Sequence, residues 1–352
     1  MLSNTDVAEL LARQAERKSG IVARAFRRAA RGAFLWPEEV AQVAAQNRSL
    51  TELRSIGPFI ERELRRWLDK PPPPSITKIP EIRRDFISLA EARRLLAMKP
   101  AWPKKLRGDL QMHTCWSDGS GTIAEMADAA KKRSYGYIGI TDHSKGLKIA
   151  GGINESTLRK QGTEIAKVNN ATSKLGEKLI VLRSIELNIN SRGEGDMSPA
   201  SLSPLDLVLG SFHSSLRTIE DQTDRYLAAL RNPHIQILGH PRGRIYNYRL
   251  GLRADWGRVF AEATRLDKAL EIDCYPDRQD LNVDLLNIAR KQGTRIALGT
   301  DAHHPWQLEF IELGLAAALK ANVPAERIIN FLPILDLTTW VRQIRDSSAR
   351  KR

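Results

Sequence analysis

Short apolar runs alternate along the chain with longer segments in which apolar residues recur at helical spacing. Seven runs have the length of a β-strand, at residues 106–113, 137–141, 179–182, 205–210, 235–239, 269–270 and 295–299. Between them lie segments of helical periodicity, at residues 123–132, 155–175, 222–230, 256–266 and 283–292. Strands that alternate with helices in this way predict an α/β fold with parallel strands and crossover helices.

Each of the seven runs is followed within a few residues by a side chain that can bind a metal ion. The residues concerned are His113 and Asp118, Asp142 and His143, Glu186, His213, His240, Glu271 and Asp273, and Asp301 and His303. If the strands close into a barrel, their carboxyl ends face one mouth and these side chains meet there. The alternative is a doubly wound sheet in which the polar strand ends are coincidental.

The motifs around these residues are similar to those of the PHP (polymerase and histidinol phosphatase) superfamily. They are Thr141-Asp142-His143-Ser144-Lys145, Ser211-Phe212-His213-Ser214, Gly239-His240-Pro241-Arg242-Gly243-Arg244, Pro276-Asp277-Arg278-Gln279-Asp280-Leu281 and Gly299-Thr300-Asp301-Ala302-His303. The resemblance extends from about residue 108 to about residue 316, and is strongest to the PHP domain attached to bacterial family X DNA polymerases. It implies a distorted (β/α)7 barrel that holds three divalent metal ions.

The resemblance implies a ligand set for each ion. The first would be held by His113, Glu186 and Asp301, the second by Glu186, His213 and His240, and the third by Asp118, His143 and His303. Gln111 stands where many members have a further histidine ligand, and a neutral amide would bind the first ion more weakly. Imidazole and carboxylate ligands suit Mn²⁺, Zn²⁺ or iron, and ligand type alone does not choose among these metals.

Metal-activated water would hydrolyse a phosphoester at such a site, without a protein nucleophile or a nucleotide cofactor. Asp142 and His143 are candidates for orienting the ligands, and Lys145 and Arg244 for holding phosphate oxygens. For Arg278, an ion pair with Asp280 is the favoured interpretation. Glu271 is expected to hydrogen-bond to the metal ligands and not to bind a metal ion itself.

Residues 1–70 predict a small helical domain with basic and apolar faces. Arg24, Arg27, Arg28 and Arg31 recur at three- and four-residue spacing and would share one helix face. Such a row suits a phosphate backbone, although a merely solvated face explains it equally well.

The segment around Gly57 resembles a helix-hairpin-helix, an element that binds DNA without sequence specificity. Pro58 would open the second helix, and the backbone N–H groups near Ile56 and Gly57, together with Arg62, would hold phosphate oxygens. Ser55 occupies a position that is usually glycine. Glu63 occupies the position of the lysine of lyase-competent relatives, so we expect no deoxyribose-phosphate lyase activity. A protein-interaction bundle is the alternative.

Residues 71–106 read as a Pro-rich linker, with a stiff spacer at residues 71–74 and a connector helix at residues 83–96. The PHP domain is expected over residues 107–345. A family X polymerase has a palm between these two parts, and only a linker stands there in this sequence. We therefore expect no polymerase activity.

The charge of the chain favours an anionic partner. The formal net charge is +14, and residues 1–106 contain 21 Lys and Arg against 12 Asp and Glu, a net +9 that leaves +5 for the remainder. With two cysteines and neither a membrane span nor a signal peptide in the pattern, a cytoplasmic protein with no membrane partner is expected.

These observations favour a metal-dependent phosphoesterase that cuts DNA phosphodiesters, as a 3′–5′ exonuclease or in repair-type end processing. Its DNA partner would be a single strand, a gapped duplex or a 3′ end. Two alternatives remain: a small-molecule phosphomonoesterase of the histidinol-phosphatase type, and a non-catalytic DNA-binding scaffold with a degenerate barrel.

Overall fold

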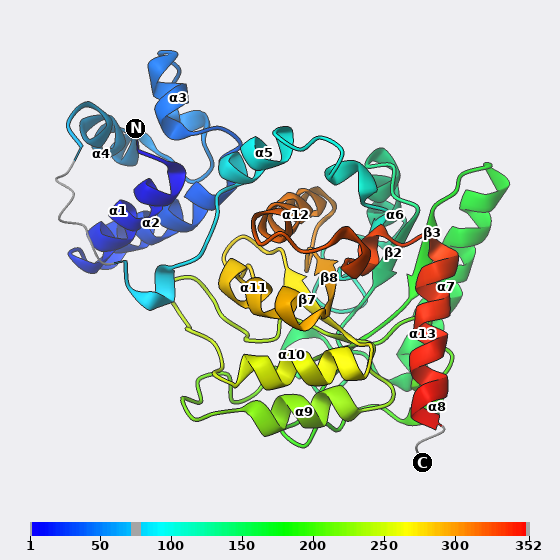
Figure 1. Ribbon diagram of the computed structural model, residues 1–352. Helices are drawn as coiled ribbons and strands as arrows, with labels where there is room; N and C mark the ends of the chain where they lie inside the picture. Colours follow the sequence, from blue (N-terminus) through cyan, green and yellow to red (C-terminus); the bar gives the residue numbers. More distant parts are fainter. Residues whose placement is uncertain (1, 72–78, 350–352) are drawn as a thin grey trace.

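The computed structural model describes residues 2–71 and 79–349 (Figure 1). An N-terminal helical unit, drawn in blue, lies beside a larger α/β unit. The helical unit consists of α1 (Asn4–Glu16), α2 (Gly20–Gly32), η1 (Ala33–Leu35), α3 (Val40–Ala45), η2 (Leu50–Glu52) and α4 (Pro58–Asp69). The predicted fold class, an α/β barrel preceded by a helical region, is confirmed.

Local sequence signals explain where the N-terminal helices begin. The Ser3 hydroxyl accepts from the Asp6 amide, and the Asp6 carboxylate accepts from the Ser3 amide, which caps α1 from both directions. A cap of this kind is worth about 1 kcal/mol. α4 begins at Pro58, as predicted. The apolar faces of these helices close around Phe26, Trp36 and Leu64, all of which are buried.

The linker differs from the prediction of one continuous connector helix. It contains η3 (Glu81–Arg83), then a segment without regular secondary structure, then α5 (Leu89–Ala97) and η4 (Pro103–Lys105). The helix begins later than predicted because the Ser88 hydroxyl caps it by accepting from the Glu91 amide. Residues 72–74 of the predicted spacer lie outside the described residues.

The α/β unit has eight short strands. They are β1 (Gly108–Asp109), β2 (Tyr137–Ile140), β3 (Ile180–Arg183), β4 (Glu186–Asn188), β5 (Leu209–Ser211), β6 (Ile237–Leu238), β7 (Ala269–Asp273) and β8 (Arg295–Gly299). The connecting and flanking helices are η5 (Lys148–Ala150), α6 (Ile123–Lys132), α7 (Glu155–Lys174), α8 (Pro199–Leu202), α9 (Thr223–Arg231), α10 (Trp256–Arg265), α11 (Val283–Gln292), η6 (Pro305–Phe310), α12 (Ile311–Lys320), η7 (Ala325–Arg327), η8 (Ile329–Phe331) and α13 (Ile334–Ala349).

All strand pairs between the named strands are parallel, in two sheets of order β1-β2-β3 and β4-β5-β6-β7-β8. The third predicted run corresponds to β3, which continues into β4 after a two-residue interruption. β1 and β8 meet at the other seam, where the Leu110 amide donates to Leu298 O and the Asp301 amide donates to Gln111 O. The two sheets together therefore form the distorted barrel.

One end of the barrel is closed by apolar packing. Leu337, Trp340 and Ile344 of α13 pack with Tyr137 and Ala269, the first residues of β2 and β7. This helix covers the amino ends of the strands, so the carboxyl ends are the ones left for a functional site. No helix within the described ranges is both long and apolar enough to cross a membrane.

The helical unit is joined to the barrel through the linker and the loop that follows β6. Buried Arg83 donates to Glu9 at 2.8 Å, to Glu16 at 2.5 Å and to Asn247 at 2.9 Å. Tyr246 from the same loop donates its hydroxyl to Ala8 O and packs its ring edge-on against Phe34, with centroids 4.8 Å apart. Removing one member of a buried ion pair costs about 3–5 kcal/mol, so these contacts hold the two units in one arrangement.

Candidate metal centre

The structure gathers most of the predicted ligands at the carboxyl ends of the strands. They line a bowl of about 190 Å³ together with residues of the surrounding loops. The bowl is lined by Asp118, His143, Leu147, Ala150, His213, Leu216, His240, Gly243, Ile245, Arg249, Arg278, Asp301 and His303. His113 and Glu186 lie fully buried beneath it, in contact with these ligands.

Glu186 is the centre of the cluster. Its Oε1 lies 2.7 Å from His240 Nε2 and 3.1 Å from His213 Nε2, while its Oε2 lies 3.0 Å from His143 Nδ1. Burial alone would raise the pKa of this carboxyl, but the surrounding imidazoles outweigh burial and hold the pKa well below its usual range. Glu186 therefore stays ionised and can bridge two cations.

His113, Glu186 and Asp301 form the first group of ligand atoms close enough to share one ion. His113 Nε2 lies 2.8 Å from Asp301 Oδ1 and 3.4 Å from Glu186 Oε2. Burial opposes ionisation of Asp301, yet the neighbouring Arg278 and His113 keep the pKa of its carboxyl below the ordinary value. This group has the composition that the sequence predicted for the first ion.

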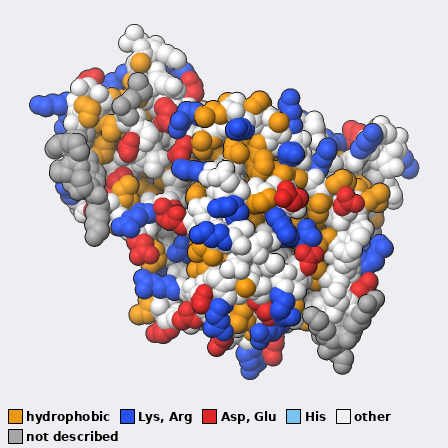
Figure 2. Space-filling view, in the orientation of Figure 1, with side chains coloured by type: hydrophobic (Ala, Val, Ile, Leu, Met, Phe, Trp, Pro, Cys, Tyr) orange, Lys and Arg blue, Asp and Glu red, His pale blue; other side chains and the backbone are white. Residues whose placement is uncertain are grey.

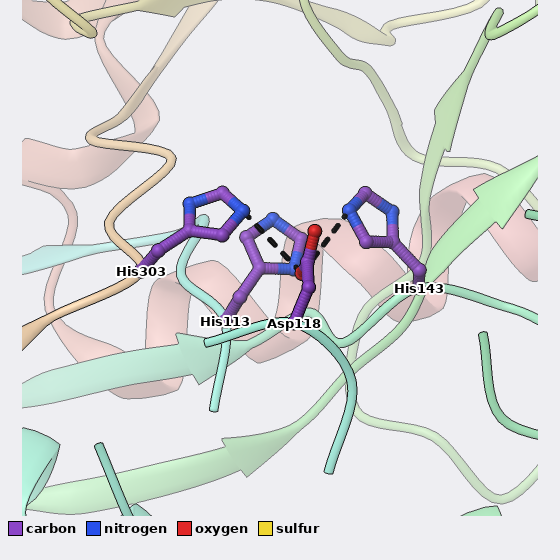
Figure 3. A group of neighbouring side chains, drawn as sticks. All are labelled: His113, Asp118, His143 and His303. Atoms are coloured by element: carbon purple, nitrogen blue, oxygen red, sulfur yellow. Dashed lines mark ion pairs between the residues drawn. The ribbon is translucent and has the colours of Figure 1, made fainter. Parts of the chain in front are cut away.

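Asp118 forms a second group with three imidazoles (Figure 3). Its Oδ1 lies between His303 Nε2, at 3.4 Å, and His143 Nε2, at 3.6 Å. The His113 ring stacks on both of these rings, with centroid distances of 4.5 Å and 4.3 Å. These four residues offer ligand atoms within reach of one another. They include the set predicted for the third ion.

The third group contains His143, Glu186 and His213. The predicted second set had His240 in place of His143, and His240 also contacts Glu186. Burial opposes protonation of His240, but the Glu186 charge outweighs it and raises the pKa of the imidazole to about 9. At neutral pH His240 is therefore protonated beside Glu186, and an ion held with its help would have to displace that proton.

The backbone at two ligands is in the left-handed region. His240 has φ +24° and Asp301 has φ +52°, a conformation that costs free energy for residues other than glycine. Both residues stand two positions after the end of a strand, and the turn directs their side chains toward Glu186 and His113. Strain of this kind clusters at functional sites because the surrounding fold holds a geometry that the local chain would not choose.

Several ligand atoms in this cluster are buried without a hydrogen-bond partner among the described residues. They are His113 Nδ1, His143 Nδ1, Glu186 Oε2 and His213 Nε2. The His143 and Glu186 atoms are near each other, but they do not have hydrogen-bonding geometry. Buried polar atoms normally find partners, so this donor set fits divalent cations.

Gln111 has a partner other than the clustered ligands. With its amide oriented to donate, its nitrogen lies 2.6 Å and 2.8 Å from the two oxygens of Glu271. Glu271 also accepts from the His240 amide at 2.8 Å. Burial and the nearby Asp273 raise the pKa of the Glu271 carboxyl well above its ordinary value. A ligand role for Gln111 stays a prediction. In the structure its amide contacts Glu271, and Glu271 in turn holds the backbone N–H of His240.

Asp142 is not among the residues that line the bowl, so it does not touch a substrate there, and its contacts fit the orienting role expected from the sequence. Its carboxylate accepts from the Thr114 amide and hydroxyl, the Ser117 hydroxyl and the Gln161 amide, at 2.6–2.8 Å. Three of these bonds fix the loop between His113 and Asp118, and the fourth ties Asp142 to α7. Asp142 thus positions the first motif, because its side chain is fully occupied by that loop and by α7.

Arg244 also requires a correction. Its guanidinium donates to the carbonyls of Arg278 at 2.7 Å and Asp85 at 2.8 Å, and lies 3.9 Å from the Phe86 ring centroid. It is buried at the contact with the linker, so it cannot hold a phosphate in this arrangement. Lys145 is half-exposed and pairs with Glu155 at 2.6 Å.

Two other arginines line the bowl instead. Arg278 pairs with Asp301 and lies 3.6 Å from Asp273, whereas the sequence favoured a pair with Asp280. Arg249 donates to the Gly243 carbonyl. Sequence reasoning missed Arg249 because it stands nine residues after His240, in a loop without a repeating pattern.

The predicted arginine row lies on one exposed side of α2. Arg24, Arg27, Arg28 and Arg31 all line a groove of about 620 Å³. Its other lining residues are Ile245, Tyr246, Asn247, Tyr248, Tyr275, Asp277 and Arg278. Ile245 and Arg278 line the bowl as well, so the groove and the bowl adjoin.

The hairpin residues have different environments. Ile56 is buried, and its amide donates to Leu53 O, which corrects its prediction as a DNA contact. Gly57 caps α4 with extended backbone, and Arg62 is exposed. Ser55 adopts φ +67°, which explains why this position favours glycine in such hairpins.

Comparisons with known proteins agree with this geometry. The family model described as "PHP domain" matches residues 109–275. The chain is 34% identical to "DNA polymerase/3'-5' exonuclease PolX" of Bacillus subtilis over 240 residues, which is 68% of this chain and 41% of that protein. It is 27% identical to a "Probable phosphatase" of Caldicellulosiruptor bescii over 59% of this chain and 84% of that protein.

Among solved structures, histidinol phosphate phosphatase from Lactococcus lactis, a complex with zinc, L-histidinol and phosphate, matches with a TM-score of 0.38 and 16% identity. This match covers 69% of the chain and 93% of that structure. The chain spans about two fifths of the length of PolX.

Proposed function

Because the chain contains a PHP domain at residues 109–275 and is on that basis a metal-dependent phosphoester hydrolase, we propose that its substrate is DNA. The reaction would be hydrolysis of phosphodiesters at a strand end, in the 3′–5′ direction. The observation that supports this proposal is that the arginine-lined groove of α2 adjoins the ligand bowl, because Ile245 and Arg278 line both. Phosphates held by the arginines would lead a strand toward the ligands.

The charge of the groove differs from that of the general surface. Over the face shown in Figure 2, Lys and Arg side chains are interspersed with Asp and Glu, so net charge alone marks no binding surface there. The groove has five arginines and one acidic residue, Asp277, among its lining residues. An excess of arginine in a concave surface attracts a polyanion and supplies bidentate contacts to phosphate.

The ligand cluster would hold divalent ions through His113, Glu186 and Asp301 in one group and Asp118, His143 and His303 in another, with His213 and His240 around Glu186. Bound ions would neutralise phosphate charge and lower the pKa of water to about 7. Mn²⁺, Zn²⁺ and iron all suit these ligands.

The protein residues around the ions have separate tasks. Arg278, at the junction of groove and bowl, is placed to contact a non-bridging phosphate oxygen while one of its N–H groups stays on Asp301. Arg249 adds positive charge to the wall of the bowl. In this proposal residues 1–70 bind DNA and residues 107–345 hydrolyse it, connected by the linker of residues 71–106.

Hydrolysis of a small phosphomonoester is the second candidate. It is favoured by the bowl of about 190 Å³, which is smaller than most ligand sites, and by the relatives named probable phosphatases. It leaves the arginine row of α2 without a role, because a small substrate would fill the bowl alone.

One assay separates the candidates. Purified protein with Mn²⁺ is incubated with a labelled single strand, a gapped duplex and histidinol phosphate, and His213→Ala and His304→Ala are compared with it. We expect nucleotide release from DNA, and His213→Ala should reduce its rate at least about a hundredfold. Mutation of residues that only hydrogen-bond to metal ligands already lowers activity about 10–100-fold. His304 is exposed and accepts from the Trp306 amide outside the ligand cluster, so it is the matched histidine control.

Phosphate release from histidinol phosphate alone would replace the proposal with the second candidate. An unreduced rate in His213→Ala would refute the ligand assignment.

A further inference from the structure

The groove beside the bowl has a basic wall and an aromatic wall. α2 provides the basic wall through Arg24, Arg27, Arg28 and Arg31. The loop after His240 provides Tyr248, and the segment after β7 provides Tyr275. The two kinds of wall face the same space, which is what a chain of alternating phosphates and bases requires.

Tyr248 is the aromatic residue most open to a ligand. Tyr248 is 59% exposed, so part of its ring is accessible to a ligand in the groove. The Arg217 guanidinium lies 4.5 Å from its ring centroid, which holds the ring in place from one side. The backbone is held too, because the Tyr248 amide donates to Ile245 O.

Tyr275 is less open. Its ring packs edge-on against Phe310 with centroids 5.2 Å apart, and Arg278 lies 5.3 Å from its centroid. Asp277 is the acidic residue of the groove, and its carboxylate lies 4.0 Å from Arg31. The remaining arginines of the row, Arg24, Arg27 and Arg28, therefore face the groove without this local neutralisation.

The length of the basic wall fits a few nucleotides. Seven residues separate Arg24 from Arg31, and at about 1.5 Å per residue the row extends about 10 Å along the helix. A fully stacked strand, which advances about 3.4 Å per nucleotide as in a duplex, would place about three phosphates over this length, and a less stacked strand would place fewer. The groove then continues to the bowl through Ile245 and Arg278.

We propose that this groove binds an unpaired DNA strand, with a base stacked on Tyr248 and its phosphates on the arginine row. The inference rests on the proposed function and adds a substrate class to it: single strands and frayed 3′ ends, in preference to blunt duplex. A base inside a duplex has both faces covered by its neighbours, so away from a duplex end only an unpaired base can stack on Tyr248. Stacking of this kind is worth about 1–3 kcal/mol per base and does not depend on sequence.

The test measures binding without hydrolysis. Fluorescence anisotropy in EDTA gives the affinity of the full-length protein for a single-stranded oligonucleotide, a blunt duplex and a single strand without bases. Tyr248→Ala and Tyr248→Phe are compared with Leu175→Ala, because Leu175 is also a well-exposed apolar residue, just after α7 and remote in sequence from the groove lining.

We expect Tyr248→Ala to weaken binding of the single strand about 5- to 150-fold, the range that corresponds to stacking of one base. Tyr248→Phe should bind within about twofold of the parent because it keeps the ring. The strand without bases should bind the parent and Tyr248→Ala alike. Equal affinity of Tyr248→Ala and parent for the single strand, or tighter binding of blunt duplex than of single strand by the parent, would overturn the inference.

The outcome for the proposed function is read separately, from nucleotide release by the parent protein with Mn²⁺. Release together with unchanged binding by Tyr248→Ala rejects the stacking site alone. Failure of the parent to release nucleotides rejects the proposed function, whatever Tyr248 does.

Discussion

At the scale of single residues, Lys268 has a pKa that is strongly changed by burial. The residue is 2% exposed, and its ammonium donates to the Asn232 carbonyl at 2.5 Å. Burial lowers the pKa of this lysine to about 7. In the unfolded chain the pKa is ordinary, near 10.5, so between about pH 7 and pH 10.5 the unfolded state binds a proton that the folded state lacks.

This difference predicts a pH-dependent effect of Lys268→Met. Because the unfolded state binds more protons in that window, the parent's free energy of unfolding should rise with pH there relative to the variant's. The slope should approach about 1.4 kcal/mol per pH unit. Urea unfolding of both proteins at pH 7, 8 and 9 measures it. Parallel stability curves would contradict the lowered pKa.

Among the elements, the hairpin before α4 offers a position, Gly57, where a charged side chain can be introduced to test DNA binding. Gly57 is the N-cap of α4, with φ −109° and ψ 173°, and a Cβ built on it would meet nothing within 4 Å. Any residue can adopt this extended backbone, and Asp and Asn are favoured N-caps. A side chain can therefore be introduced there without loss of the fold.

Gly57→Asp should preserve stability and weaken DNA binding about tenfold or more, because it places a negative charge where a phosphate is expected at the positive end of the helix. Gly57→Asn is the matched neutral control, with the same shape and a similar cap. Anisotropy titrations with single-stranded DNA at low salt compare the two. Equal binding by the Asp and Asn variants would place the phosphate contact elsewhere.

At the scale of the whole molecule, the candidate metal centre joins distant parts of the chain. Its proposed ligands follow β1, β2, β5, β6 and β8 or lie in β4, and Arg278 connects Asp301 to the groove. An ion that binds only this folded arrangement stabilises the entire barrel, by about 2.7 kcal/mol when its free concentration is a hundred times its Kd.

Addition of Mn²⁺ or Zn²⁺ to EDTA-treated protein should therefore raise the midpoint of thermal unfolding, and excess EDTA should reverse the rise. His213→Ala should show a smaller rise, because one imidazole around Glu186 is missing. Differential scanning calorimetry at several metal concentrations measures the effect. A midpoint that does not respond to any of these metals would contradict the metal centre without reference to catalysis.

The periodicity of the sequence determined the elements and the residues at their ends. The helices predicted at residues 123–132 and 283–292 have those bounds, because their apolar faces and the caps Thr122 and Asn282 are local signals. His113, Glu186 and Asp301 were likewise predictable, since side chains at the ends of parallel strands must share one edge.

Only the tertiary structure decided which long side chains reach the site. Arg278 pairs with Asp301 and not with Asp280, Arg244 is buried against the linker, and Tyr248 lines the same groove as the arginines of α2. These partners are far apart in sequence, and the reach of an arginine or tyrosine depends on the packing of whole units. Local pattern therefore specifies strands, helices and candidate ligands, while the groove beside them follows from how the helical unit docks on the barrel.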